Sequence, residues 1–489
     1  MKRSRSLTNF IYNSAYHIFA ILIPLITTPF VSRKLGAAGI GDYSYAYSVA
    51  SYFALFIKLG LANYGNRTIA FARGKGKDLS KEFWSIYLFQ LLMGVVANVI
   101  YLIYCFTFAA SPTISLLILL YLVSVGIDIT WFFWGLENFK LTVTRDFIVK
   151  IFTTVCIFVF IRSADDVWKY TLILSGGSFL SQALLWTSLR KYIHWSKPSW
   201  SEIKQHIKPN LILFVPSIAV SFYKIMDKIM LGAMSSTVEV GFYHSSERVL
   251  QVPMALVTSL GTVMQPRMSN LISKDTEKEY LASVMVKSIA LALFLSTSLG
   301  FGIMTVSNEF VPIFYGQGFE KCSTLFLILL PSCMFLSFTN VFKSQYMVPN
   351  KLDKEYTIAL FTGAAVNLLF NSILIPRIAS IGAAWGTLFA EISVTIVITI
   401  IMSRTVKIWR YYKVALPFIA SGLVMFFTCK GIHFETGAIS GLLLKIIISG
   451  TVYMASLLIL LSIGGKWFGL NLKELFGQLI PMLLRRKKE

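Results

Sequence analysis

The chain has 489 residues, of which 56% are apolar and 14% are charged, and its mean hydropathy is +0.68. Soluble domains carry roughly 25% charged residues, so this composition excludes an ordinary soluble protein and indicates that most of the chain lies in a lipid bilayer. The net charge is +22 at pH 7. Its basic residues are divided among many short segments between apolar runs, which excludes a compact nucleic-acid-binding module.

Apolar windows long enough to cross a bilayer follow one another along the whole chain. A spanning helix needs about 20 mostly apolar residues, because the hydrocarbon core is roughly 30 Å thick. The segments left between such windows are too short for a soluble catalytic domain. The predicted spans, about fourteen in number, cover approximately residues 9–32, 41–61, 83–109, 113–134, 147–161, 168–188, 210–231, 240–263, 284–306, 322–342, 356–375, 381–402, 414–431 and 441–463.

The distribution of lysine and arginine predicts the orientation. Most of the 45 basic residues fall in alternate segments, beginning with Lys2, Arg3 and Arg5, and short cytoplasmic loops are enriched in both residue types. An even number of spans then places both termini in the cytoplasm. We expect the basic segments to contact anionic lipid headgroups, and the first apolar run to be a retained helix rather than a cleaved signal.

No motif for a metal site or a cofactor is visible in the sequence. The five cysteines have no paired spacing and are typical of packing residues, and the five histidines lie far apart without an HExxH pattern. Walker A, GxSxG and dinucleotide-binding motifs do not occur. We therefore predict a transporter rather than an enzyme, without a cofactor, driven by H⁺, Na⁺ or the membrane potential.

The two halves of the chain contain a similar turn sequence. Leu35-Gly36-Ala37 leads to Gly41, and about 196 to 200 residues later Leu231-Gly232-Ala233 leads to Gly241. Six spans separate the copies, so both halves enter the membrane in the same direction, and parallel repeats of this kind occur in transporters. The predicted domains are an N-terminal lobe (1–195), a C-terminal lobe (196–412), two further helices (413–465) and a basic cytoplasmic tail (466–489).

Four pieces of the sequence carry a family resemblance. They are Pro29–Gly36 with Gly39-Ile40-Gly41, the stretch Trp131–Phe139, the stretch Asp227–Gly232, and Asn367 and Asn371 followed by Ile375-Pro376 and Gly382-Ala383-Ala384. In this order they resemble the polysaccharide-exporter branch of the multidrug/oligosaccharidyl-lipid/polysaccharide (MOP) superfamily, the Wzx-type flippases. The resemblance covers roughly residues 5–465.

The resemblance implies an all-α, two-lobed bundle in a prokaryotic cytoplasmic membrane, with two extra C-terminal helices. It implies a transporter that moves undecaprenyl-diphosphate-linked oligosaccharide from the cytoplasmic to the outer leaflet by alternating access. The implied partners are that substrate, membrane lipids and other polysaccharide-assembly membrane proteins, and no nucleic acid. Lipid II flippases of this superfamily carry arginines in the first span, whereas the first span here has no basic residue.

Two cations within spans seven and eight form the main predicted substrate site. Lys224 lies about eight residues before span seven ends, and Arg248 lies about eight residues after span eight begins, so both lie some 12 Å below the outer face. Charged residues at this depth are costly and mark functional sites. Asp227 and Glu247 lie beside them, so the alternatives are a diphosphate site and a structural ion-pair cluster.

Further polar residues of spans one and two are candidate sugar or phosphate contacts. For Lys58, near the cytoplasmic end of span two, snorkelling to the headgroups is the favoured interpretation; against it, Ser44, Ser51 and Lys58 share one helical face. Asn13 and His17 share a face of span one, where they either bind sugar hydroxyls or pack against another helix. His17 is also a candidate for proton coupling.

Two acidic residues within spans are candidates for ion coupling. Asp128 in span four and Glu391 in span twelve either bind a coupling cation or pair with a lysine of a neighbouring helix. Asn367 and Asn371 are interpreted as contacts between helices.

Two other functions remain open. A cation-coupled multidrug exporter of the same superfamily would present acidic residues to its drugs, and a membrane glycosyltransferase or polymerase would need paired acid and base groups. Neither pattern is prominent in this sequence.

Overall fold

The structure is a computed structural model that describes residues 2–76, 78–434 and 437–470. Within these ranges it does not describe the side chains of residues 2–22, 215–217, 219–220, 222–224 and 466. Helices make up nearly all of the described chain, and strands do not occur in it. The all-α prediction is therefore confirmed.

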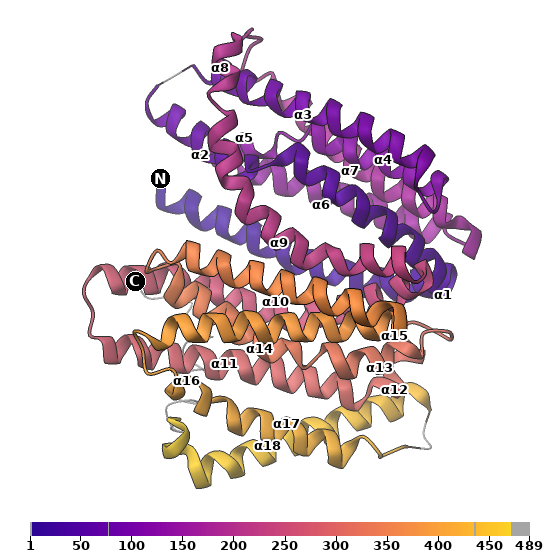
Figure 1. Cartoon of the computed structure of the whole chain (residues 1–489), viewed down its shortest axis with the longest axis vertical. Helices are drawn as coiled ribbons and strands as arrows, with labels where there is room; N and C mark the ends of the chain where they lie inside the picture. The colour runs from indigo at the N-terminus through magenta and orange to yellow at the C-terminus, as the bar shows by residue number, and fades with distance from the viewer. Residues whose placement is uncertain (1, 77, 435–436, 471–489) are drawn as a thin grey trace. The chain divides into compact units, whose positions relative to one another are not determined.

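Two compact units divide the chain, residues 1–241 and residues 242–489. Within the first unit, α3, α4 and α7 run alongside one another (Figure 1). Its helices are α1 (Lys2–Lys58), α2 (Leu61–Gly74), α3 (Leu79–Thr107), α4 (Pro112–Gly126), α5 (Thr130–Gly135), α6 (Phe139–Phe160), the 3₁₀ turn η1 (Ala164–Asp166), α7 (Val167–Leu189), α8 (Trp200–Lys204) and α9 (Ile207–Met234).

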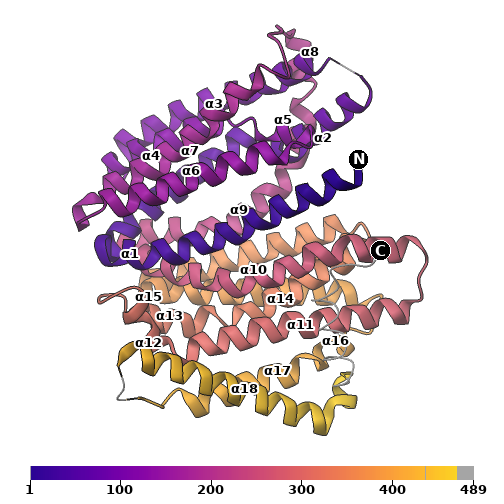
Figure 2. The ribbon, with the colours of Figure 1, turned by 180° about the vertical axis from the view of Figure 1, so that it is seen from behind.

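The second unit packs α11 against both α14 and α17, and α17 and α18 lie side by side (Figure 2). A partly buried ion pair between Glu309 and Lys445, with 2.7 Å between Oε1 and Nζ, joins α12 to α18. The helices are α10 (Thr237–Ser273), which starts in the first unit, α11 (Lys278–Thr305), α12 (Ser307–Phe314), α13 (Lys321–Leu329), α14 (Ser332–Phe342), the π-helical η2 (Lys343–Met347), α15 (Asp353–Ser403), α16 (Trp409–Lys413), α17 (Ala415–Cys429) and α18 (Ala438–Phe468).

All fourteen predicted spans fall on helices. Among the described residues, nine helical segments are long and apolar enough to cross a membrane. Two of them, Ile23–Gly74 and Asp353–Ser403, each cover two predicted spans; the windows at 147–161, 210–231 and 240–263 fall on α6, α9 and α10. The lobe boundary predicted at residue 195 rests on the sequence repeat and stays a prediction; by contacts, α9 belongs to the first unit.

Two of the long helices are interrupted by non-helical backbone. Gly36 in α1 has φ 65°, which glycine adopts without a steric penalty. In α15 the break is at Ile378 and Ala379, just after Pro376, whose ring removes one helical hydrogen bond. Each break separates two predicted spans, so α1 and α15 are both helical hairpins.

The repeated glycines mark a close helix crossing inside the first unit. A Cβ atom at Gly41 would overlap the carbonyl oxygen of Thr237, and one at Gly241 would overlap the carbonyl oxygen of Ala37. Gly41 and Gly241 are 200 residues apart, and so are their partners Ala37 and Thr237. Each copy of the repeated turn therefore places its glycine against the other copy. The requirement for glycine at this crossing gives a physical reason for the repeated turn.

The segment between α7 and α9 is anchored on α3. Ser199 begins α8 with a capping box in which the Glu202 carboxylate accepts from the Ser199 N–H. Glu202 also pairs with Lys81 of α3. The lysine, together with the Ser199 N–H, lowers the pKa of Glu202.

His206 forms a second anchor at the start of α9. It is 2% exposed; its Nδ1 lies 2.7 Å from the Tyr64 hydroxyl and its Nε2 lies 2.9 Å from the Ser85 hydroxyl. The Ser85 hydroxyl donates to the Glu82 carbonyl, so it accepts from Nε2–H, and Nδ1 accepts from Tyr64. Burial lowers the pKa of His206, and the Glu82 carboxylate opposes this shift.

We expect Gly41→Ala to destabilise the protein by about 1 to 3 kcal/mol, because a methyl group there overpacks a backbone contact. Thermal unfolding in detergent measures this. The matched control is Gly302→Ala in α11, where a Cβ meets no atom within 4 Å; it should be neutral or slightly stabilising. Equal melting temperatures for the two variants would contradict the close crossing.

We expect the contact between α9 and α3 to weaken at acidic pH. Since the folded state favours neutral His206, the unfolded state binds more protons between the lowered pKa and the ordinary value of about 6.5. The contribution of neutral His206 to the stability of the folded state is therefore fully present above about pH 6.5. It is lost as the pH falls through the lowered pKa. Hydrogen exchange of residues 200–210, corrected for intrinsic rates, should show weaker protection at about pH 5.5 than at about pH 7.5.

The variant His206→Asn, which does not titrate, serves as the control. It should abolish this pH dependence while leaving protection elsewhere in α3 unchanged. If protection of residues 200–210 in the unmodified protein does not change with pH, the role assigned to His206 is wrong.

Candidate functional site

An ion pair near the end of α1 is the centre of a polar region inside the first unit. Lys58 Nζ lies 2.9 Å from Asp128 Oδ2, and the two side chains are 44% and 15% exposed. Lys58 comes from the last turn of α1, and Asp128 from the break between α4 and α5. The structure therefore pairs Lys58 with an acidic residue, whereas snorkelling and substrate binding by Lys58 stay predictions.

The break between α4 and α5 positions Asp128. Within a membrane, a helix break is tolerated where other groups satisfy its free carbonyls. The side-chain amide of Gln90 lies 3.0 Å from the Val125 carbonyl oxygen, 3.3 Å from that of Gly126 and 3.0 Å from that of Asp128. Trp131 holds Gln90 in place by donating from Nε1 to Oε1 over 3.0 Å.

Two further bonds complete the break. The indole N–H of Trp186 donates to the Ile127 carbonyl over 2.8 Å, and Asp128 Oδ1 accepts from the Thr130 N–H over 2.9 Å. The aromatic stretch that carries part of the family resemblance thus lies in and beside the turn that presents Asp128.

A second group of charges lies on α6 and α7. Arg145 Nη2 lies 2.8 Å from Asp146 Oδ1, and its Nη1 lies 3.2 Å from Gln182 Oε1. The Ser181 hydroxyl donates to the same Asp146 oxygen over 2.8 Å. The Arg145 side chain is 6% exposed, and its Nε has no hydrogen-bond partner among the described residues. Arg145 thus retains an unused donor in a buried position.

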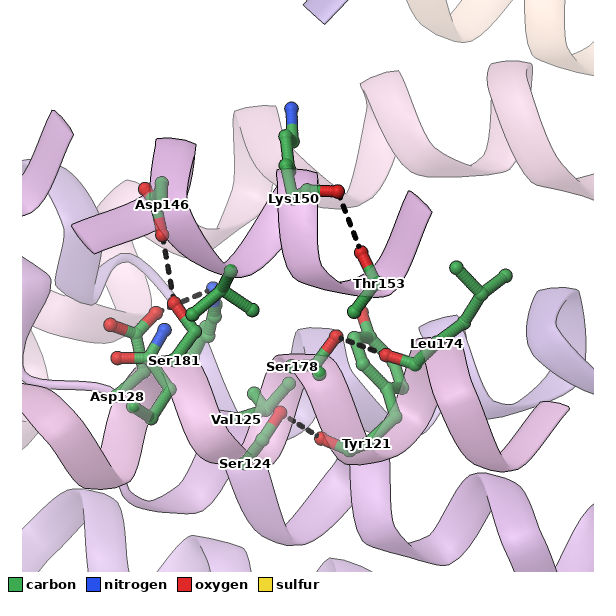
Figure 3. A pocket seen from close by; sticks show the side chains of 14 residues that line it. Tyr121, Ser124, Val125, Asp128, Asp146, Lys150, Thr153, Leu174, Ser178 and Ser181 are labelled. Carbon is green, nitrogen blue, oxygen red and sulfur yellow. Dashed lines mark hydrogen bonds and ion pairs between the residues drawn. The ribbon is translucent and has the colours of Figure 1, made fainter. Parts of the chain in front are cut away.

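Both charge groups border two adjoining hollows of about 290 and 220 Å³, which we call the polar cavity. Lys58, Asp128, Asp146 and Gln182 line both hollows. Figure 3 shows Asp128 and Asp146 on the same side of the larger hollow, whereas the amino group of Lys150 points away from them. The other polar lining residues are Gln90, Tyr121, Ser124, Thr130, Arg145, Thr153, Ser178 and Ser181.

The polar cavity holds two cations that can bind an anion. Lys58 and Arg145 equal Asp128 and Asp146 in number, and Lys150 lines the larger hollow with its amino group pointing away from both carboxylates (Figure 3). Arginine and lysine bind phosphate oxygens through charge-assisted hydrogen bonds. In this structure the two carboxylates pair with the Lys58 and Arg145 groups that would bind such an anion.

The main predicted anion site lies partly outside the described side chains. The side chains of Lys224, Asn13 and His17 lie outside the described residues. Asp227 is buried in the first unit, whereas Glu247 and Arg248 are half-buried in the second. Their proposed roles in substrate binding remain predictions.

The two acidic candidates for ion coupling differ in their surroundings. Asp128 pairs with the lysine of a neighbouring helix, which is one of its two predicted alternatives. Glu391 is 3% exposed, and its Oε2 has no hydrogen-bond partner among the described residues. On the same helix, Asn371 Nδ2 donates to Asn367 Oδ1 over 3.0 Å.

The sequence analysis missed Gln90, Arg145, Asp146 and Gln182. The predicted fifth span starts at residue 147, but α6 begins at Phe139, so Arg145 and Asp146 lie inside the helix rather than in a cytoplasmic loop. A signal was present, because Asp146, Lys150 and Thr153 are spaced by four and three residues on one helical face.

Comparisons with known proteins agree with this architecture. Residues 6–272 match the family model described as "Polysaccharide biosynthesis protein". A putative O-antigen transporter of Escherichia coli (strain K12) is 22% identical over 393 residues, covering 79% of this chain and 94% of that protein. The probable low-salt glycan biosynthesis flippase Agl15 of Haloferax volcanii is 27% identical over 191 residues, covering 39% of this chain and 40% of that protein.

Solved structures show the same fold at low sequence identity. The lipid II flippase MurJ, in an inward closed conformation, matches with a TM-score of 0.72 and 15% identity over 93% of this chain and 99% of that one. An inward-facing multidrug transporter of the MATE family matches with a TM-score of 0.54 and 13% identity over 78% of this chain and 98% of that one. These matches confirm the predicted fold class.

We expect Lys58 and Asp128 to be energetically coupled. The single variants Lys58→Met and Asp128→Asn should each lower the melting temperature in detergent, because each leaves the other partner uncompensated. The double variant should lose less stability than the two single variants together. We expect a coupling free energy of about 1 kcal/mol, because Lys58 is partly exposed. The control is Lys140→Met at an exposed position of α6; additive losses would show that the pair is not coupled.

Proposed function

The chain belongs to the polysaccharide biosynthesis protein family, as a Wzx-type member of the MOP superfamily, and we propose that it moves a lipid-linked oligosaccharide from the cytoplasmic to the outer leaflet. The match to the family model over residues 6–272 carries this proposal. The named relatives are a transporter and a flippase, and the full-length fold match is to a lipid II flippase. We place the protein in a prokaryotic cytoplasmic membrane with both termini in the cytoplasm.

The polar cavity supplies groups suited to the substrate headgroup. An undecaprenyl diphosphate carries phosphate oxygens that need cationic donors, and Lys58 and Arg145 are such donors. Asp128 and Asp146 balance these cations while the headgroup is absent, which lowers the cost of holding them at membrane depth. Serine and glutamine side chains around the cavity can bond sugar hydroxyls.

The membrane potential favours export. A charge that crosses 100 mV changes its energy by about 2.3 kcal/mol, so a diphosphate with about two negative charges gains roughly 4 to 5 kcal/mol on leaving a negative cytoplasm. Coupling to H⁺ or Na⁺ is a further part of the proposal. Glu391 is its candidate, because its buried carboxylate has an oxygen, Oε2, without a hydrogen-bond partner among the described residues, and a coupling cation would supply one.

The test is the leaflet distribution of lipid-linked oligosaccharide, read with an impermeant sugar-modifying probe in cells depleted of the protein. We expect the oligosaccharide to accumulate on the cytoplasmic leaflet. Re-expression of the unmodified protein should reverse this, and the variant carrying Lys58→Ala and Arg145→Ala should restore at most about a tenth of the rate, because two charge-assisted contacts are lost.

The matched control is Lys140→Ala, an exposed basic residue of the same helix as Arg145, which should restore the full rate. An unchanged leaflet distribution after depletion would overturn the proposed function and direct attention to drug export, measured as accumulation of toxic cations. Full activity of the double variant would remove the polar cavity from the mechanism but not the function.

A further inference from the structure

A separate hollow, of about 680 Å³, lies in the first unit away from the polar cavity. It is formed by the start of α3, the end of α7 and the segment that follows α7, which is the predicted cytoplasmic end of these spans. Its volume falls in the range typical of small-molecule sites, roughly 300 to 1,000 Å³. Among the residues that line it are Trp84, Trp186, Thr187, Arg190, His194 and Trp195. We call it the tryptophan pocket.

Hydrogen bonds fold the segment after α7 back onto α3 and so build the pocket. The backbone N–H of His194 donates to the Ser80 hydroxyl over 3.2 Å, and His194 Nδ1 lies 3.0 Å from the same oxygen. Trp84 Nε1 donates to the His194 carbonyl over 2.9 Å. Trp195 then packs edge-on against Trp84, with 4.3 Å between ring centroids.

Two tryptophans of the pocket, Trp84 and Trp186, are not arranged as in an interfacial aromatic belt. In such a belt, the polar indole N–H faces the headgroups while the ring contacts the lipid. Here the N–H of Trp84 and that of Trp186 both donate to backbone carbonyls inside the protein, those of His194 and Ile127. These two indoles are therefore held in place and contribute apolar ring surface to the pocket.

The polar groups at the pocket suit hydroxyls better than phosphate. His194 uses Nδ1 for Ser80 and has Nε2 left for a ligand. The Thr187 hydroxyl donates to the Leu184 carbonyl and keeps its acceptor lone pairs. Arg190, which is exposed, is the one permanently charged side chain among the described lining residues. A phosphate-binding site would be expected to gather several cationic donors.

From these observations we infer that the tryptophan pocket binds a sugar residue of the lipid-linked oligosaccharide on the cytoplasmic side before translocation. The inference rests on the proposed function and adds a glycan-binding site distinct from the polar cavity. A sugar ring presents apolar C–H faces and a rim of hydroxyls, which match fixed indole rings bordered by Arg190, His194 and Thr187. Since docking precedes the crossing step, the pocket affects the half-saturating substrate concentration and leaves the maximal rate unchanged.

Trp195→Ala tests the pocket, because Trp195 is 64% exposed and packs its ring against that of Trp84. The assay is the initial flipping rate in phosphatidylcholine vesicles as a function of substrate. The probe is the lipid-linked oligosaccharide fraction extracted from cells depleted of the protein. We expect a rise of about tenfold in the half-saturating concentration with an unchanged maximal rate, as for loss of one aromatic anchor.

Two variants serve as controls. Trp195→Phe keeps an aromatic ring and should remain close to the unmodified protein. Trp409→Ala removes a tryptophan of similar exposure, 62%, from the second unit, and should change nothing. An unchanged half-saturating concentration for Trp195→Ala, with the unmodified protein active, would overturn the inference and leave the proposed function intact.

Two further outcomes are distinguishable. If the unmodified protein does not flip the extracted lipid, the proposed function itself fails. If Trp195→Ala alters transport in vesicles that contain phosphatidylglycerol and not in pure phosphatidylcholine, the occupant is an anionic phospholipid headgroup, and the sugar assignment is overturned.

Discussion

Inside a hydrocarbon layer, water does not replace a missing hydrogen bond, so each interruption of a helix needs a partner from within the protein. The break between α4 and α5 meets this requirement through Gln90, whose amide reaches three carbonyls, and through Trp186, whose indole reaches a fourth. Because the break is held this way, Asp128 can leave the helix and meet Lys58. The polar cavity exists because the broken backbone is satisfied elsewhere.

Tryptophans that hold the helix break also line the two candidate binding regions. Trp186 donates to the break beside the polar cavity, and its ring lines the tryptophan pocket at the end of α7. Trp131 orients Gln90 and lines the polar cavity. Aromatic residues in this unit therefore act through their N–H groups as well as through buried area.

Two pairs of opposite charges border the polar cavity of the first unit. Lys58 with Asp128 and Arg145 with Asp146 place opposite charges side by side. Pairing lowers the cost of ionised groups at membrane depth, and an arriving anion can exchange partners with the carboxylates. In the second unit, Glu391 Oε2 has no hydrogen-bond partner among the described residues, which is why Glu391 remains the candidate for ion coupling.

The sequence by itself determined that the chain is all-α and where its apolar helices lie, because hydrophobic length is a local property of the sequence. It also showed the glycine repeat at Gly41 and Gly241. The tertiary structure alone revealed that these glycines meet Thr237 and Ala37, since overlap depends on two helices approaching closely. It likewise decided that Lys58 pairs with Asp128, and that Arg145 and Asp146 belong to the polar cavity. Which side chains pair across long sequence distances depends on how the helices pack. The spacing of apolar residues does not show which helices become neighbours.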